Sequence, residues 1–252
     1  MPKLIVVGSG IKSIAHLTEE SKRVIQQADK VLYLLNEDHM KEWVRQEAKQ
    51  SESLESIYFS DTNRAIAYQK ITDYIVEQYE HYNVLCVVFY GHPTLFADSA
   101  LQAVKNINAS GGDAIVLPAV SSMDCLFADL KVDPGKSGLF SIEATELLLF
   151  ERNIDTYAHN IIWQIANIGR GDRKATNYFN VLREYLLEFY PQNQLMCLYE
   201  APLLPATPFN ATWFKLTELL KQPFNHTTTL YIPPKGPKPI GSRFSDILAN
   251  NN

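Results

Sequence analysis

The 252-residue sequence has little of what marks a secreted, metal-binding or membrane-spanning protein. Its three cysteines, Cys86, Cys125 and Cys197, lie far apart in apolar surroundings. This spacing indicates neither a disulfide framework nor a Cys-x-x-Cys zinc site, and predicts buried, reduced thiols. No apolar run reaches the ~18 residues that span a bilayer, and no apolar leader follows a charged start. We therefore expect a cytoplasmic protein with no membrane partner.

An excess of basic residues is also missing, and so are the motifs of several enzyme classes. The net charge is −5, so we expect no nucleic-acid partner. No P-loop, Glu-x-x-His or Gly-x-Ser-x-Gly motif occurs and the six histidines are scattered, so we expect no metal site. Gly8 and Gly10 follow an apolar run, but Ser13 stands where a dinucleotide fingerprint needs its third glycine.

Apolar segments alternate with helical ones in the first half of the chain, which predicts an α/β fold with a mostly parallel sheet. The predicted strands lie at residues 4–7, 31–35, 84–89 and 114–117. A helix is predicted from its N-cap Thr18 to about Ala28, and others over 62–80 and 95–109. Between residues 35 and 80 we expect a helix, a strand and a helix, the last of which is the one over 62–80.

The expected elements become longer and more widely spaced after Pro118, which predicts a second α/β domain with more antiparallel pairing. A helix over 121–130 is expected to take Ser121 or Ser122 as its N-cap, and another helix is expected over about 176–189. The predicted strands lie at residues 147–150, 160–165, 196–198 and 228–232. We place the domains at residues 1–118 and 119–235, followed by a tail over 236–252.

The apolar strand predicted over 84–89 ends at Tyr90-Gly91-His92-Pro93. In open α/β sheets, ligands bind at the carboxyl ends of strands. A tyrosine and a histidine at that position therefore suggest a binding site. The alternative is that this segment is only a loop.

Arg64 and Tyr68 lie four residues apart in a predicted helix, so they share one helix face. A guanidinium beside a phenol favours the phenolate, and such a pair could take a proton from a weak acid. Stacking on a half-exposed helix is the alternative. Tyr58 could join the pair or close the edge of the domain. Gln164 could hydrogen-bond a nucleobase-like edge or a local backbone group.

Taken together, these segments resemble the tetrapyrrole-methylase superfamily of S-adenosylmethionine-dependent methyltransferases over about residues 3–235. Val6-Val-Gly-Ser-Gly10, Tyr90-Gly-His-Pro93 and Pro118-Ala-Val-Ser-Ser122 carry this likeness. The chain specifically resembles the borosins, which are peptide-backbone α-N-methyltransferases. The segments that carry this second likeness are Tyr58, Arg64-x-x-x-Tyr68, Tyr90-Gly-His-Pro93, Cys125-Leu-Phe-Ala-Asp-Leu130, Asp133-Pro-Gly-x-Ser-Gly138, Trp163-Gln-Ile-Ala166, Tyr199-Glu-Ala-Pro202 and Thr228-Thr-Leu-Tyr-Ile-Pro-Pro234. Ile11-Lys12 replaces the Pro-Gly that follows this position in corrin and porphyrin methylases, which favours the peptide branch.

The resemblance implies two α/β domains of the tetrapyrrole-methylase type with the cofactor, S-adenosyl-L-methionine, in a cleft between them. S-adenosylhomocysteine is the implied product. The catalytic residues implied by the match are Tyr58, Arg64, Tyr68 and Tyr90. The implied cofactor contacts are Tyr90, His92, Leu95, Ser121, Ser122, Gln164, Tyr199, Thr228 and Thr229.

The implied reaction is methylation of backbone amides in a ribosomal precursor peptide, a step of borosin natural-product biosynthesis. The resemblance also implies a homodimer, which could form a heterotetramer with two precursor chains. Fused borosin enzymes carry their substrate beyond a helical clasp, and the sequence ends at Asn252, so we expect a split enzyme with a separate precursor. The alternatives are a tetrapyrrole or other small-molecule methyltransferase, and a non-catalytic binding module on the same fold.

Overall fold

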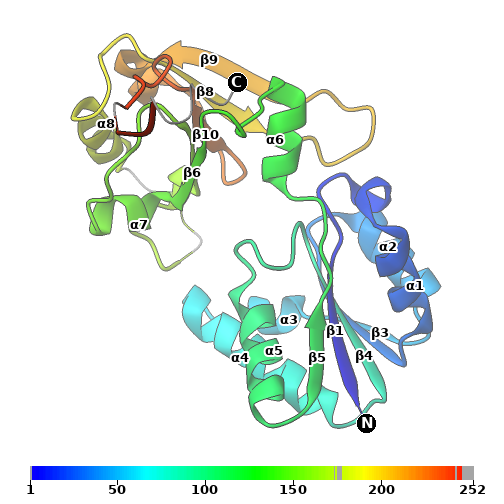
Figure 1. Cartoon of the computed structure of the whole chain (residues 1–252). Coiled ribbons are helices and arrows are strands. Elements are labelled where there is room, and N and C mark those ends of the chain that lie inside the picture. Colours follow the sequence, from blue (N-terminus) through cyan, green and yellow to red (C-terminus); the bar gives the residue numbers. More distant parts are fainter. Residues whose placement is uncertain (1, 173, 175–177, 242, 246–252) are drawn as a thin grey trace. The chain divides into compact units, whose positions relative to one another are not determined.

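The computed structural model describes residues 2–172, 174, 178–241 and 243–245 (Figure 1). Its contacts divide the chain into two compact units. The first unit holds residues 1–132, 170–174 and 201–210, and the second holds 133–169, 175–200 and 211–252. The main segment of the first unit extends one helix beyond our predicted boundary at 118–119. The domain bounds themselves stay a prediction.

A five-stranded parallel sheet in the order β3-β2-β4-β1-β5 forms the centre of the first unit. Its strands are β1 (Lys3–Gly8), β2 (Lys30–Leu34), β3 (Ser51–Ser53), β4 (Val84–Phe89) and β5 (Asp113–Val116). Strand β4 lies between β1 and β2, and its residues 85–89 are buried. This position explains the unbroken apolar run in the sequence, because a central parallel strand is covered on both faces. The predicted parallel sheet is confirmed.

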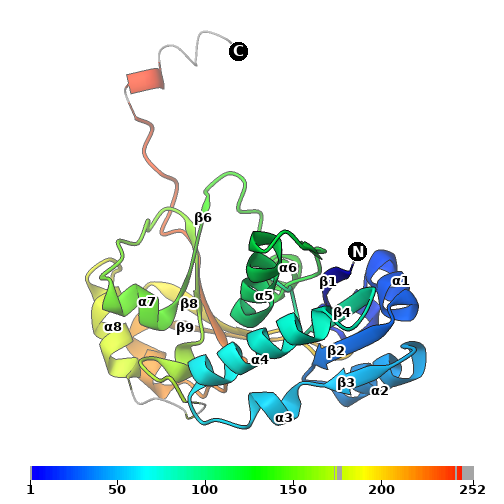
Figure 2. The same cartoon turned by 90° about the horizontal axis from the view of Figure 1, so that it is seen from below.

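Helices cover both faces of this sheet (Figures 1 and 2). One face packs against α1 (Glu19–Gln27) and α2 (Asp38–Glu47). The other face packs against α4 (Arg64–Tyr79) and α5 (Asp98–Ala109). The one-turn helix α3 (Glu55–Tyr58) leads toward α4.

Side-chain caps begin two helices of the first unit as predicted. The hydroxyl of Thr18 accepts from the backbone N–H of Ser21 at 3.0 Å, which confirms the N-cap of α1. Ser121 caps α6 (Ser122–Leu130) in a capping box with Asp124.

A 3-10 turn, η1 (Ser13–His16), precedes α1. All three cysteines are buried and free, as the sequence predicts.

A mixed five-stranded sheet in the order β6-β7-β10-β8-β9 forms the second unit. Its strands are β6 (Leu139–Glu143), β7 (His159–Trp163), β8 (Leu195–Glu200), β9 (Asn210–Lys215) and β10 (Thr229–Ile232). Strand β10 runs antiparallel to β7 and β8, whereas β6 and β7 are parallel. The predicted increase in antiparallel pairing is therefore confirmed.

One hydrophobic core joins this second sheet to its helices. Residues from α7 (Ala144–Leu149), α8 (Phe179–Leu187) and the 3-10 helix η3 (Leu216–Lys221) pack against Ile162, Leu198 and Leu230. A second 3-10 helix, η2 (Ile165–Asn167), follows β7. The predicted helix over 176–189 corresponds to α8, and its expected first two residues, 176 and 177, lie outside the described residues.

The strand predicted over 147–150 is wrong, because most of that segment belongs to helix α7. A short apolar run does not distinguish a buried strand from a buried helix turn. Here the side chain of Glu143 accepts from the backbone N–H of Glu146 at 2.9 Å and caps a helix. Strands β6 and β9 were not predicted, since several of their side chains are exposed and their apolar pattern is weak. Within the described ranges, no helix has the length and apolarity to cross a membrane.

Candidate functional site

A pocket of about 200 Å³ opens in the first unit, where β2 and β4 end. The sequence predicted a ligand site at this end of β4. The lining comes from the residues that follow both strands, from α3 and α4, and from the segment before α5. These residues are Leu34, Leu35, Asn36, Glu55, Tyr58, Phe59, Tyr68, Phe89, Tyr90, Phe96 and Ala97. Most of them are aromatic or aliphatic, and the polar side-chain groups among them are three phenol hydroxyls, the Asn36 amide and the Glu55 carboxylate.

Tyr58 and Tyr68 stand next to each other in this pocket, and Arg64 contacts Tyr68. Tyr58 ends α3, and its ring is stacked on that of Tyr68 with centroids 6.0 Å apart and planes 22° apart. The guanidinium Nη2 of Arg64 donates to the hydroxyl of Tyr68 at 3.2 Å. The backbone N–H of Arg64, the first residue of α4, donates to the carbonyl oxygen of Gly171 at 3.0 Å. Arg64 and Tyr68, which the sequence predicted on one helix face, are therefore in direct contact.

Tyr90 lines the same pocket from the residue after β4. Its backbone N–H donates to the carbonyl oxygen of Leu34 at 3.1 Å. Burial, with a smaller contribution from the Cys125 thiol, raises the pKa of Tyr90 to about 12. Its hydroxyl is therefore a hydrogen-bond donor at neutral pH and is poorly suited to act as a base.

The loop that carries Tyr90 packs against the Gly8-Ser9-Gly10 segment. The backbones of Gly10 and Gly91 exchange two hydrogen bonds of 3.2 and 3.1 Å, and both residues have positive φ angles, 69° and 74°. A Cβ at Gly8 would lie 2.2 Å from the carbonyl oxygen of Gly91. These glycines therefore allow two backbone segments, far apart in sequence, to touch.

The other predicted site residues of the first unit take part in local contacts. Nδ1 of His92 lies 2.9 Å from the hydroxyl of Thr94. The hydroxyl of Ser121 donates to the Asp124 carboxylate at 2.7 Å as part of the α6 cap. Ser122 begins α6, and Leu95 is half-buried. Cofactor roles for these residues stay predictions.

The four predicted site residues of the second unit gather at one end of its sheet. Gln164 directly follows β7, and Thr229 begins β10. Thr229 pairs with Tyr199 of β8, and the next residue of β10 pairs with Ile162 of β7. The adjacent strands therefore bring Gln164, Tyr199, Thr228 and Thr229 to the same sheet end, although they are up to 65 positions apart in sequence.

Backbone conformation and polar contacts fix this sheet end. Gln164 has a left-handed backbone with φ of 54°, which is uncommon for a residue other than glycine. The Thr228 hydroxyl donates to the carboxylate of Glu200 and accepts from the backbone N–H of Asn225 at 2.9 Å. Tyr199, Thr228 and Thr229 are buried. The group offers an amide and hydroxyls at defined positions.

The sequence model of the family Tetrapyrrole (Corrin/Porphyrin) Methylases matches residues 3–194. The chain belongs to this family. Solved structures agree with the assignment at the level of the fold. Uroporphyrin-III-C-methyltransferase from Thermus thermophilus has a TM-score of 0.66 and 18% identity, and the match covers 92% of each chain. The complex of uroporphyrin-III C-methyltransferase from the same organism with S-adenosylhomocysteine has a TM-score of 0.63 and 15% identity, again over 92% of each chain. The predicted methylase fold class is thus confirmed.

Curated relatives of this family member bear out the likeness to borosin enzymes. One is a methyltransferase/ribosomally synthesized type I borosin cyclic peptide precursor from Gymnopilus junonius, 30% identical over 97% of this chain and 60% of the relative. Another of the same description from Mycena rosella is 32% identical over 97% of this chain and 63% of the relative. The chain therefore spans about three fifths of the length of these relatives.

Proposed function

We propose that this tetrapyrrole-methylase family member uses S-adenosylmethionine to methylate backbone amide nitrogens of a ribosomal precursor peptide. The observation that carries the proposal is the pocket in which Tyr58, Tyr68 and Tyr90 meet, with Arg64 on the hydroxyl of Tyr68. The borosin precursor names of the relatives support a peptide as the substrate.

The chemistry of an amide explains why these side chains would be needed. The amide nitrogen is a poor nucleophile because its lone pair is delocalised into the carbonyl group. Removing its proton, and stabilising the charge that develops on the carbonyl oxygen, overcomes this. We assign Tyr68 as the base, with its phenolate stabilised by the Arg64 guanidinium. The hydroxyls of Tyr58 and Tyr90 are donors suited to the carbonyl oxygen.

The apolar lining of the pocket supports this assignment. Water would hydrate a phenolate and screen the Arg64 charge, and the buried ring of Phe89 keeps water from one side of the pocket. Burial raises the pKa of Tyr90 to about 12, so its hydroxyl stays protonated at neutral pH and can donate a hydrogen bond to the substrate.

The predicted cofactor residues fit the chemistry of S-adenosylmethionine. The Gln164 amide and the Thr229 hydroxyl both donate and accept, whereas the Thr228 hydroxyl, whose proton goes to Glu200, can only accept. Such groups suit the donors and acceptors of an adenosine group. Aromatic walls such as those of the first-unit pocket suit a sulfonium cation. When bound, the cofactor supplies an electrophilic methyl group. We propose that Tyr90, His92, Leu95, Ser121, Ser122, Gln164, Tyr199, Thr228 and Thr229 hold it.

A direct assay mixes the chain with S-adenosylmethionine and a peptide added in trans. The peptides are the product of a short neighbouring reading frame and the precursor segment of the Mycena rosella relative. Fragmentation mass spectrometry then locates each added methyl group. Methylated backbone nitrogens are the expected result. Methyl groups on side chains alone would contradict the proposal, and transfer of label to a porphyrin or corrinoid would favour the small-molecule alternative.

We also propose that the chain acts as a homodimer and that two precursor chains can join it in a heterotetramer. The resemblance to borosin enzymes supports this assembly. Light scattering on the chain alone should give the mass of two copies, and addition of the peptide should add two peptide masses. A monomer at micromolar concentration would contradict the dimer.

A further inference from the structure

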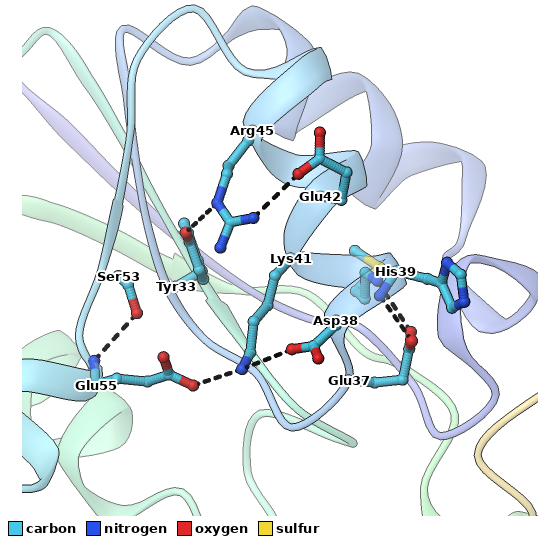
Figure 3. Close-up of polar contacts among 10 residues, drawn as sticks. Tyr33, Glu37, Asp38, His39, Lys41, Glu42, Arg45, Ser53 and Glu55 are labelled. Atoms are coloured by element: carbon cyan, nitrogen blue, oxygen red, sulfur yellow. Dashed lines mark hydrogen bonds and ion pairs between the residues drawn. The ribbon is translucent and has the colours of Figure 1, made fainter.

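Lys41 of α2 reaches across to Glu55, which begins the one-turn helix α3 (Figure 3). Its Nζ lies 2.7 Å from Oε1 of Glu55 and 3.2 Å from Oδ1 of Asp38. The side chain of Asp38 is 97% exposed, against 36% for Glu55 and 14% for Lys41. The Lys41–Glu55 pair is therefore the more sheltered of the two, and water screens it less.

Helix α3 needs outside support because it has only four residues. A single turn is not stable by itself, since nucleation costs more than its few hydrogen bonds return. The backbone N–H of Leu54 donates to the carbonyl oxygen of Tyr33 at 2.8 Å, and that of Glu55 donates to the hydroxyl of Ser53 at 3.2 Å. The ion pair between Glu55 and Lys41 adds a side-chain contact at the same end of α3.

The two ends of α3 both belong to the pocket. Glu55 and Tyr58 line it, and residues three apart on a helix lie on the same face. Any shift of the Glu55 end would move the Tyr58 ring, which is stacked on Tyr68 with centroids 6.0 Å apart. The position of Tyr58 thus depends on what holds Glu55.

We propose that Lys41 is a positioning residue of the methylation site, which holds α3 through Glu55 and so keeps Tyr58 stacked on Tyr68 in the pocket. The catalytic part of this inference rests on the proposed function. Lys41 also neutralises Glu55, the one carboxylate among the described residues that line the pocket. Without the lysine, that carboxylate would repel an anion developing at Tyr68.

The same helix supplies a matched control. Arg45 pairs with Glu42 at 3.0 Å, three positions earlier, as Lys41 does with Asp38. Its Nε also donates to the hydroxyl of Tyr33 at 3.2 Å. Arg45 is absent from the residues that the structure describes as lining the pocket. Replacing Arg45 therefore removes a comparable charge and helix pair without touching α3.

The experiment compares Lys41→Met, Lys41→Arg, Arg45→Met and Asp38→Asn by amide hydrogen exchange and by methylation kinetics. In Lys41→Met, we expect faster exchange of the segment 54–60 with the rest of the chain unchanged, because the amide hydrogen bonds of α3 open more often. We expect kcat to fall about tenfold, with little change in the peptide KM or in cofactor affinity, because misplaced catalytic groups slow the reaction step. Lys41→Arg should restore most of the rate. Arg45→Met and Asp38→Asn should stay within about twofold of the parent chain, as for most exposed charges.

A second variant checks that Lys41 acts through Glu55. Glu55→Gln should change exchange and kcat in the same direction as Lys41→Met. The double variant should be no slower than Lys41→Met alone, because both changes break one contact. If the losses of kcat in the two single variants add up in the double variant, the proposal is overturned.

Two further results would overturn it. One is equal exchange at 54–60 in Lys41→Met and Arg45→Met. The other is a general loss of protection with kcat per folded molecule unchanged, which would mean that Lys41 only stabilises the fold. If the parent chain itself transfers no methyl group, the proposed function fails, and the exchange comparison still decides whether Lys41 holds α3.

Discussion

The two units position their polar residues in different ways. In the first unit, Tyr58 and Tyr68 come from helices α3 and α4 beside a parallel sheet, and side-chain contacts such as Lys41–Glu55 support them. In the second unit, Thr229 and Tyr199 face each other across two antiparallel strands, so the strand register places them. A single contact can change the position of a side chain on a short helix. A side chain placed by strand register moves only when the pairing of its strand changes. We therefore expect changes at the helix-borne residues Tyr58 and Tyr68 to alter mainly the rate of the reaction, and changes at the strand-end residues of the second unit to alter mainly cofactor binding.

The sharpest test of this division lies in the Arg64–Tyr68 contact. Tyr68→Phe and Arg64→Met should each lower kcat by at least about 100-fold, because a general base and its stabilising charge are removed. Cofactor affinity, measured by calorimetry, should change less than about twofold, as is usual when an exposed charged side chain is replaced. Loss of cofactor binding in Tyr68→Phe would contradict the role assigned to it.

The second unit should show the opposite pattern. Gln164→Gly removes the amide side chain but tolerates the left-handed backbone at φ 54°. We expect the cofactor Kd to rise about tenfold, the value of one or two hydrogen bonds, with kcat at saturation little changed. Gln164→Ala should lose the same affinity and also some stability, because alanine disfavours that backbone conformation. A normal Kd in both variants would remove Gln164 from the cofactor site.

The close approach of Gly8 to Gly91 allows a test of the framework of the first unit. Gly8→Ala places a Cβ 2.2 Å from a carbonyl oxygen, so the free energy of unfolding should fall by about 1–3 kcal/mol. Urea denaturation measures this. Gly171→Ala is the control, since its Cβ would meet no atom within 4 Å, and it should change stability by less than about 0.5 kcal/mol. Equal stability of both variants would contradict the tight contact.

The smallest expected effect concerns the Tyr90 proton. Burial raises the folded-state pKa of Tyr90 to about 12, above its usual value of 10.0. Such a group stabilises the fold fully at pH values below its unfolded pKa, and this contribution is lost as the pH rises from 10.0 toward about 12. Tyr90→Phe should make the fall of unfolding free energy over this range shallower, as urea titrations at several pH values would show. An unchanged slope would contradict the burial of this hydroxyl.

Local patterns predicted much of the first unit. The apolar run of β4, the Thr18 cap and the spacing of Arg64 and Tyr68 all depend on residues close in sequence, and the structure contains each of them. The same reasoning gave the wrong element at 147–150, where a cap at Glu143 selects a helix for an apolar run that also suits a strand. Edge strands β6 and β9 lack a clear apolar alternation and were not found.

The candidate site was predicted only in part. Tyr58, Tyr68 and Tyr90 were singled out, and all three line one pocket. Glu55 and Phe96 were not, because nothing in their local sequence differs from that of ordinary surface residues. The contact between Lys41 and Glu55 joins two elements that are 14 positions apart, and no helical or strand period connects them.

The sequence by itself determined most of the alternation of strands and helices, the Thr18 cap and the methylase family, because these depend on neighbouring residues and on short motifs. Only the tertiary structure decided which side chains share a pocket. Strand order places Leu34 of β2 beside Phe89 of β4, 55 positions later, and so brings the ends of both strands together. It likewise places Tyr199 opposite Thr229. Such contacts arise from the packing of whole elements, which the local periodicity of a sequence does not encode.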